Sequence, residues 1–402
     1  MSNTDEIRKI ISDNRDNIAF LIGNGIHYQF KDCELSWKEL IKKLWRKYVD
    51  DRDHLIGDMS LTEIYDVIEI NAIEIFQKEE FQRQKVSLSN ILKEGKIKDL
   101  FDSDTQDRFQ KISQLSQSTH IQPQSVNIEA YRAFQEGLQR LTKSCRNWCN
   151  SNIEGSESLS DEQCISEMLG VICNPSKVQI LRNLLKREVG SMFPSKDSYQ
   201  LADCISYIKR LNVPVLTTNF DTYISDSIGA KRFINDLGGN NYKFTDFYPW
   251  NAYYSIDKLN GNILDNFGIW HINGTTDYPR SIRLGLSDYM GCVERARGMI
   301  QGNNLNEYFS GKQQSYWKGY NTWLHIIFNR NLFIFGLALE QNEVFLRWLL
   351  IQRSKYSRLY SQDLHGWYVG KDIAEGKKYF LEFLGFKVIE LLDFDELYNA
   401  LK

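Results

Sequence analysis

The chain has 402 residues, of which 42% are apolar and 25% are charged, and its formal net charge is −3. This composition is sufficient for a substantial core, and the length predicts two domains or one domain with a large insertion. Because the charge is nearly balanced and no basic block dominates, the sequence argues against a protein that binds nucleic acid over a broad phosphate-contacting surface.

No segment of the sequence predicts secretion or membrane insertion. The first ten residues are polar and charged, unlike a secretory signal. The most apolar stretch, residues 331–350, is interrupted by Glu340, Glu343 and Arg347, so we expect no membrane span and no membrane partner. The seven cysteines are scattered and form no C-x-x-C pair, which predicts reduced thiols and a cytoplasmic location.

The first predicted element is a buried strand over Ile18–Ile22, which leads directly into Gly23-Asn24-Gly25. Glycines in such a turn let the backbone approach a pyrophosphate, and the start of a following helix supplies N–H donors. The alternative is a tight strand-to-helix turn that needs glycine for its backbone angles alone. The third glycine of the dinucleotide-binding fingerprint is missing, so this motif by itself leaves both interpretations open.

Helical patterns follow this first strand. Ser36 and Glu39 form a capping box at the start of a helix that continues to Tyr48, with apolar side chains recurring on one face. From about residue 60 to 210 the pattern remains helical without strand-like alternation. We therefore predict a helical insertion module over residues 60–210, and a second domain formed by residues 1–59 together with residues 211–402.

Strand signals return after residue 210 and alternate with helices to the end of the chain. The predicted strands and the helix that follows each of them are 213–216 with 223–228, 267–271, 331–336 with 341–353, 366–369 with 373–384, and 386–389 with 393–401. Such alternation is typical of right-handed βαβ units. The sequence thus predicts an α/β protein, a Rossmann-like parallel sheet with helices on both faces and a large helical insertion.

Polar residues with chemical potential follow the second predicted strand in the segment Thr217-Thr218-Asn219-Phe220-Asp221. The Asn219 amide is suited to hold a water or a ribose hydroxyl, and the Asp221 carboxylate to orient that amide or to bind the ribose. The alternative is a turn in which Asp221 caps the following helix, irrespective of function.

His271 ends the third predicted strand and precedes Gly274 by three residues, while His27 follows the first glycine turn. A lone histidine is more often structural than catalytic, but parallel sheets bind ligands outside the carboxyl ends of their strands. We therefore expect the three strand ends to form one nucleotide pocket, with His271 as a general base or as a partner of the ribose hydroxyls.

These three motifs, in this order, resemble the sirtuin-like family of NAD-binding proteins over about residues 15–30 and 210–390. By this resemblance Asn219 and His271 are the catalytic residues. The residues that match the family's NAD-binding positions are Gly23, Asn24, Gly25, His27, Thr218, Asp221, Gly274 and Gly336.

The chain also departs from the family pattern. Asn24 stands where alanine is usual, His27 where a serine is often found, and two residues separate His271 from Gly274. Protein deacylases of the family carry a zinc ribbon with two cysteine pairs just after the histidine, whereas residues 272–330 contain one cysteine, Cys292. The chain therefore resembles the zinc-free bacterial effectors of this family, which hydrolyse NAD in anti-phage defence.

This resemblance implies an NAD⁺ glycohydrolase that depletes NAD and causes abortive infection, with NAD⁺ as substrate, no cofactor and no bound zinc. It also implies a homo-oligomer and activation by a partner protein, a nucleotide signal or a phage component. One alternative is a sensor subunit of a defence complex that binds NAD or ADP-ribose without turnover, which an assay of NAD⁺ consumption would distinguish. Another is a protein deacylase or ADP-ribosyltransferase, which an acyl-peptide assay would test.

Overall fold

The computed structural model describes residues 2–29, 37–76, 143, 146, 175–192, 203–235, 249–259, 261–300, 317–320, 322–340 and 343–402. The chain divides into two compact units, one made of residues 1–69 and 183–402 and the other of residues 70–182. The first unit contains the sheet and every residue of the candidate site. Most of the predicted insertion over residues 60–210, and the capping residue Ser36, lie outside the described residues.

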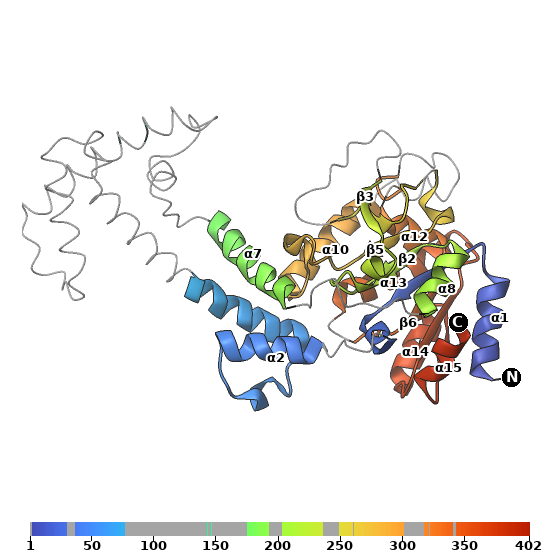
Figure 1. The fold of residues 1–402 in the computed structure, drawn as a ribbon, viewed down its shortest axis with the longest axis horizontal. Coiled ribbons are helices and arrows are strands. Elements are labelled where there is room, and N and C mark those ends of the chain that lie inside the picture. Colours follow the sequence, from blue (N-terminus) through green and yellow to red (C-terminus); the bar gives the residue numbers. More distant parts are fainter. Residues whose placement is uncertain are drawn as a thin grey trace, which may run out of the picture. The chain divides into compact units, whose positions relative to one another are not determined.

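The first unit is built on one eight-stranded sheet, ordered β3-β4-β5-β2-β1-β6-β7-β8 (Figure 1). The strands are β1 (Ile18–Ile22), β2 (Val215–Thr217), β3 (Lys231–Ile234), β4 (Ala252–Ser255), β5 (Ile269–His271), β6 (Asn331–Phe335), β7 (Gly366–Gly370) and β8 (Phe386–Glu390). The six strands β5, β2, β1, β6, β7 and β8, adjacent in the sheet in this order, are parallel to one another. When these six strands are renumbered 1 to 6 by their order in the chain, their order across the sheet is 3-2-1-4-5-6. This is the Rossmann arrangement, which confirms the predicted fold class.

One edge of the sheet differs from the sequence prediction of a parallel sheet. Strands β3 and β4 pair antiparallel, and β4 pairs antiparallel with β5, so the sheet is mixed. Strand β3 has the sequence Lys-Arg-Phe-Ile and is mostly exposed, so it lacks the apolar run by which the buried strands were recognised. Charged residues on an exposed edge strand discourage pairing with other chains.

Helices cover both faces of the sheet. Along β1 the side chains of Phe20 and of Leu21 enter two different cores, as the alternation of a strand requires. The core of Phe20 contains side chains from α1 (Asn3–Asp13), α8 (Asp203–Leu211), α9 (Tyr223–Ser227) and α15 (Phe394–Ala400). The core of Leu21 contains side chains from α10 (Leu286–Ile300), α12 (Trp323–Asn329), α13 (Val344–Leu359) and α14 (Glu375–Phe383).

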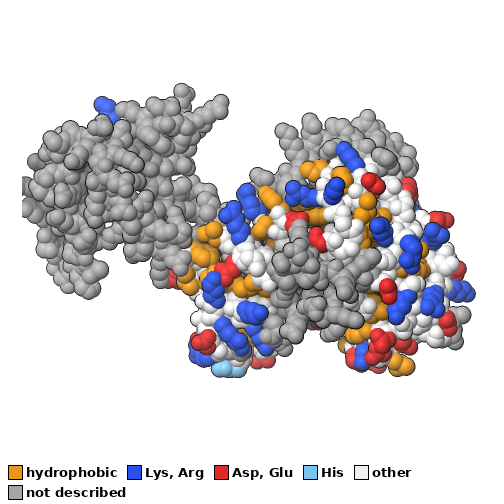
Figure 2. Space-filling model, viewed as in Figure 1, with side chains coloured by type: hydrophobic (Ala, Val, Ile, Leu, Met, Phe, Trp, Pro, Cys, Tyr) orange, Lys and Arg blue, Asp and Glu red, His pale blue; other side chains and the backbone are white. Residues whose placement is uncertain are grey.

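The remaining described helices include α2 (Trp37–Tyr48), α7 (Pro175–Ser191) and the helical residues 61–76. Within the described residues, no helix has both the length and the apolar character that crossing a bilayer requires. The coloured surface in Figure 2 shows acidic and basic side chains interspersed on the face in view. This distribution agrees with the nearly balanced charge of the sequence.

Candidate active site

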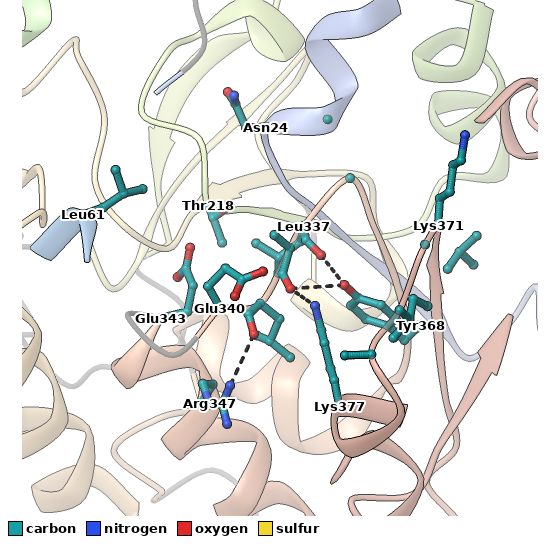
Figure 3. A pocket seen from close by; sticks show the side chains of 18 of the residues that line it. Asn24, Leu61, Thr218, Leu337, Glu340, Glu343, Arg347, Tyr368, Lys371 and Lys377 are labelled. Carbon is teal, nitrogen blue, oxygen red and sulfur yellow. Dashed lines mark hydrogen bonds between the residues drawn. The ribbon is translucent and has the colours of Figure 1, made fainter. Parts of the chain in front are cut away.

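A cavity of about 900 Å³ opens at the carboxyl edge of the parallel strands. Its lining comes from the loops after five strands, with Asn24 after β1, Thr218 after β2, Asn273 after β5, Gly336 after β6 and Lys371 after β7 (Figure 3). Ligands of open α/β sheets bind where the strand order reverses, here between β1 and β6. The cavity therefore has the place and the size expected for a dinucleotide.

The turns after β1 and β6 pack backbone against backbone, and their glycines are necessary for this contact. Gly23 N donates to Phe335 O at 3.0 Å, and Gly25 N donates to Gly336 O at 2.7 Å. A Cβ at Gly23 would lie 2.4 Å from Gly336 O, and Gly336 itself has φ +64°. The N–H groups of Gly23 and Gly25, predicted to approach phosphate, are thus already engaged with the β6 turn.

Asn219 is almost completely buried immediately after β2, within the turn that carries the predicted motif. Its backbone N donates to the Thr217 hydroxyl at 3.1 Å, and its side-chain Nδ2 donates to Gly23 O at 3.4 Å. Among the described residues, its Oδ1 atom has no hydrogen-bond partner. The amide is therefore held in place by the β1 turn and retains one acceptor for another group.

His271 lies directly against this turn. Its Nδ1 is 2.8 Å from the backbone carbonyl oxygen of Asn219, which can only accept, so Nδ1 carries the proton. Nε2 is then the acceptor of the ring, and it has no partner among the described residues. Burial lowers the pKa of His271, against the opposing effect of the hydrogen bond to Asn219, so the imidazole is neutral at physiological pH.

The candidate catalytic pair and the large cavity are adjacent rather than merged. Among the described residues, neither Asn219 nor His271 lines the cavity of 900 Å³, although Thr218 and Asn273 do. His271 instead faces a second, small cavity that is also lined by Tyr254, whose ring packs edge-on at 5.2 Å. Burial raises the pKa of the Tyr254 hydroxyl, which donates to Asp277.

Asp221 and His27 connect the turns after β2 and β1. Asp221 Oδ1 accepts from the Tyr223 N–H at 3.2 Å, as the turn interpretation of the sequence expects. Asp221 Oδ2 is 3.0 Å from His27 Nε2, and both side chains are buried. Gly274, with φ +96°, permits the loop after β5 to pass Ser281, because a Cβ there would lie 2.2 Å from Ser281 O. None of these three predicted binding residues is among the described residues that line the 900 Å³ cavity.

The cavity contains a carboxyl group that the sequence analysis did not assign to the site. Glu343 precedes α13, and its Oε2 atom is shielded from solvent without a hydrogen-bond partner among the described residues. Burial raises the pKa of Glu343 to about 7, against the opposing effect of a hydrogen bond from Asn273. In the sequence Glu343 is visible only as an interruption of an apolar stretch, which gives no indication of its place.

The opposite side of the cavity is basic and tied to the turn after β6. The Lys377 ammonium donates to Ala338 O and lies 5.1 Å from the centre of the Tyr368 ring. The Tyr368 hydroxyl donates to Leu337 O at 2.7 Å. Burial lowers the pKa of Lys377. Lys371, after β7, adds a second ammonium group to this side (Figure 3).

No protein-family model matches the chain, and no curated protein matches it. Within the described residues, no cluster of three or more His, Cys, Asp or Glu side chains is placed to hold a metal ion. The two cysteines of the described part, Cys204 and Cys292, are buried, and burial raises their thiol pKa values. The function must therefore be argued from the cavity and from the side chains around it.

Proposed function

We propose that the protein is an NAD⁺ glycohydrolase, which breaks the bond between nicotinamide and ribose. The observation that carries the proposal is a pair of buried acceptor atoms, His271 Nε2 and Asn219 Oδ1, that have no partners among the described residues. The hydrogen bond from His271 Nδ1 to the backbone carbonyl of Asn219 holds the two residues together and makes Nε2 the acceptor of the ring. Buried polar atoms are normally paired, and unpaired ones mark places where a ligand or water binds. These two lie at the sheet edge where Rossmann folds bind dinucleotides.

Breaking the bond between nicotinamide and ribose requires few catalytic groups. Nicotinamide leaves as a neutral molecule from a cationic ring, so the electron pair of the breaking C–N bond needs no acid to receive it. Water then bonds to the ribose carbon, and its proton passes to His271 Nε2, while Asn219 Oδ1 accepts a hydrogen bond from the water or from a ribose hydroxyl. Asn24, Gly25, Thr218 and Gly336 line the cavity that would hold the rest of the dinucleotide.

Substitution of the two residues tests the proposal. We expect Asn219→Ala and His271→Ala each to reduce nicotinamide release at least ~100-fold, because positioned acid–base groups contribute about 10²–10⁴-fold. His365→Ala is the matched control, since that imidazole is more than half exposed and pairs with Asp363 at the surface. Circular dichroism verifies that each variant is folded. Nicotinamide release near the wild-type rate in both variants would contradict the proposal.

The second candidate function is a sensor that binds NAD or ADP-ribose without turnover. The observation that favours it is the separation of the catalytic pair from the large cavity. Isothermal titration with NAD⁺, together with a sensitive assay for free nicotinamide, distinguishes the two: binding without any release, even with infected-cell extract present, is the result that a sensor predicts. NAD⁺-dependent removal of the acyl group from an acyl peptide would instead favour the deacylase alternative.

The proposed role in the cell is defence against phage through NAD depletion in the cytoplasm. An unrestrained NAD⁺ glycohydrolase would kill its host, so we propose that a partner protein, a nucleotide signal or a phage component activates it. We further propose that residues 60–210 mediate self-association. Light scattering of the full chain tests this last point, and a protein that stays monomeric at micromolar concentration, with and without NAD⁺, would contradict it.

A further inference from the structure

Glu343 is fixed to the strand end that carries the candidate base. The side chain of Asn273, which follows His271 by two residues, lowers the pKa of this carboxyl group and so favours its charged form. Asn273 is itself buried, and its carbonyl oxygen accepts from the Arg283 N–H at 2.9 Å. Figure 3 shows Glu343 at the opposite end of the cavity from Lys371. The carboxyl group thus belongs to the β5 side of the cavity, with a position set by a buried amide.

Among the described residues, none forms a hydrogen bond with the Oε2 atom of Glu343. Glu343 occupies the position before α13 where a side chain often caps the helix, yet it makes no capping hydrogen bond. Arg347, one turn later, donates to Leu339 O and lies 4.7 Å from the centre of the Phe380 ring. Asp288, by contrast, is paired with Lys186 at 2.8 Å. A carboxyl oxygen that is shielded from solvent and has no partner among the described residues is costly, so its retention points to a ligand.

We propose that Glu343, positioned by Asn273, binds the substrate directly by accepting hydrogen bonds from the hydroxyl groups of the ribose that carries nicotinamide. In Rossmann dinucleotide sites a carboxylate accepts from a hydroxyl of the adenosine ribose, and the same pairing is chemically suited to the second ribose. Its negative charge would also stabilise the positive charge that develops on that ribose as the glycosidic bond breaks. The low-dielectric surroundings would strengthen this effect. This inference rests on the proposed NAD⁺ substrate, but not on its hydrolysis.

The inference predicts a distinctive pH dependence. Because burial raises the pKa of Glu343 to about 7, the acceptor form is lost as the pH falls through 7, and binding should weaken there. The charged or titratable groups that line the same cavity include Tyr289 on α10, which burial keeps neutral, Arg347 on α13, Glu340 in the preceding turn, and Lys371 and Lys377 on the other side. We expect the affinity for NAD⁺ to decrease several-fold between pH 8 and pH 6.

The decisive experiment measures binding on the His271→Ala background, where the substrate is not consumed. Isothermal titration with NAD⁺ at pH 8 should show about tenfold weaker binding when Glu343→Gln is added, which is the ~1.4 kcal/mol expected for a hydrogen bond to a charged group. The pH dependence should also disappear. The matched control is Glu382→Gln, which removes an exposed carboxylate on α14 that does not line the cavity and should change the affinity less than twofold.

A second probe identifies the group that Glu343 contacts. NAD⁺ that lacks the 2′-hydroxyl of the nicotinamide ribose should show a smaller difference in affinity between the proteins with Glu343 and with Glu343→Gln than NAD⁺ does. Equal NAD⁺ affinity of these two proteins, or an undiminished effect with the deoxy probe, would overturn the inference. If the effect of Glu343→Gln is present but wild-type protein releases no nicotinamide, the inference holds and the glycohydrolase proposal fails.

Discussion

Substitution of Gly23 tests whether the glycine turn is a backbone contact between β1 and β6. In Gly23→Ala the new Cβ would lie 2.4 Å from Gly336 O and 2.6 Å from Leu337 Cα. Both are backbone atoms, so no side-chain rotation relieves the overlap. Restoring ordinary contact requires the two turns to separate by about 1 Å, and the hydrogen bond from Gly23 N to Phe335 O would lengthen with them.

The expected cost follows from these two effects. Overpacking of this kind costs about 1–3 kcal/mol, and a weakened buried hydrogen bond adds about 1 kcal/mol. We therefore expect Gly23→Ala to lower the free energy of unfolding by about 2–4 kcal/mol. Gly291→Ala is the matched control: Gly291 lies inside α10, and a Cβ there would have no atom within 4 Å. Because alanine is the better helix former, this control should gain about 0.5–1 kcal/mol.

Urea denaturation followed by tryptophan fluorescence measures the two variants against wild type. The expected result is a lower midpoint for Gly23→Ala and a slightly higher one for Gly291→Ala, with similar slopes. A Gly23→Ala protein within 0.5 kcal/mol of wild type would refute the reasoning. The turn would then be free to move, and the glycines would have to be explained by a ligand alone.

Three further predictions concern the core and the metal content. Arg353→Leu should lower the free energy of unfolding by about 3 kcal/mol or more, since the buried guanidinium donates to three carbonyl oxygens. Urea denaturation measures this effect. The control is Lys355→Leu, which replaces an exposed residue on the same helix and should leave the urea midpoint nearly unchanged. Burial lowers the pKa of His325 from 6.5 to about 3, so the folded state disfavours the charged form of this side chain. Wild-type stability should therefore fall as the pH drops from 6.5 towards 3. This fall should be smaller in His325→Phe than in the control His365→Phe, which replaces an exposed histidine. Elemental analysis should find no stoichiometric zinc, and one zinc per chain would instead reopen the deacylase alternative.

The strands that position the site were predictable because their apolar runs are short and end in glycine or polar residues. Strands β1, β6, β7 and β8 lie at or within one residue of their expected bounds. The expected strand 213–216 begins later, at Val215, because Pro214 cannot donate to the sheet. Strands β3 and β4 were not predicted: the edge strand β3 is exposed and charged, and its pairing with β4 depends on a partner about 20 residues away in sequence.

Helices that lie against the core were harder to recognise. The polar start of the chain did not predict α1, although Ser2 caps it through Asp5 N and Ile7 and Ile11 are completely buried. Helix α10 was not predicted, although its buried residues Tyr289, Cys292, Ala296 and Ile300 fall at helical spacing. Both examples show that the buried face of a short helix is decided by the partner against which it packs, which a local pattern does not contain.

The candidate site shows the same division. The sequence identifies the strand ends, and hence Asn219 and His271, because their chemistry follows apolar runs directly. It does not separate residues that face the cavity from residues that support them: Asp221 and His27 bind each other, while Thr218 lines the cavity. Glu343 could not be found from a motif, because its role depends on burial and on the approach of Asn273 from another strand.

The place of His271 bears on how the proposed reaction would be restrained. Its unpartnered Nε2 atom is buried, and the ring borders the small cavity beside Tyr254 rather than the cavity sized for a dinucleotide. A ribose in the larger cavity reaches this nitrogen only if the loops after β2 and β5 shift, because Thr218 and Asn273 stand in the cavity wall. The base is therefore in the right tautomer but buried away from the larger cavity. Bringing the two cavities together costs free energy, and the binding of an activating ligand could supply it. If the proposed reaction is right, we expect the isolated chain to bind NAD⁺ and to turn it over slowly, and we expect activation to raise the rate of turnover far more than the affinity.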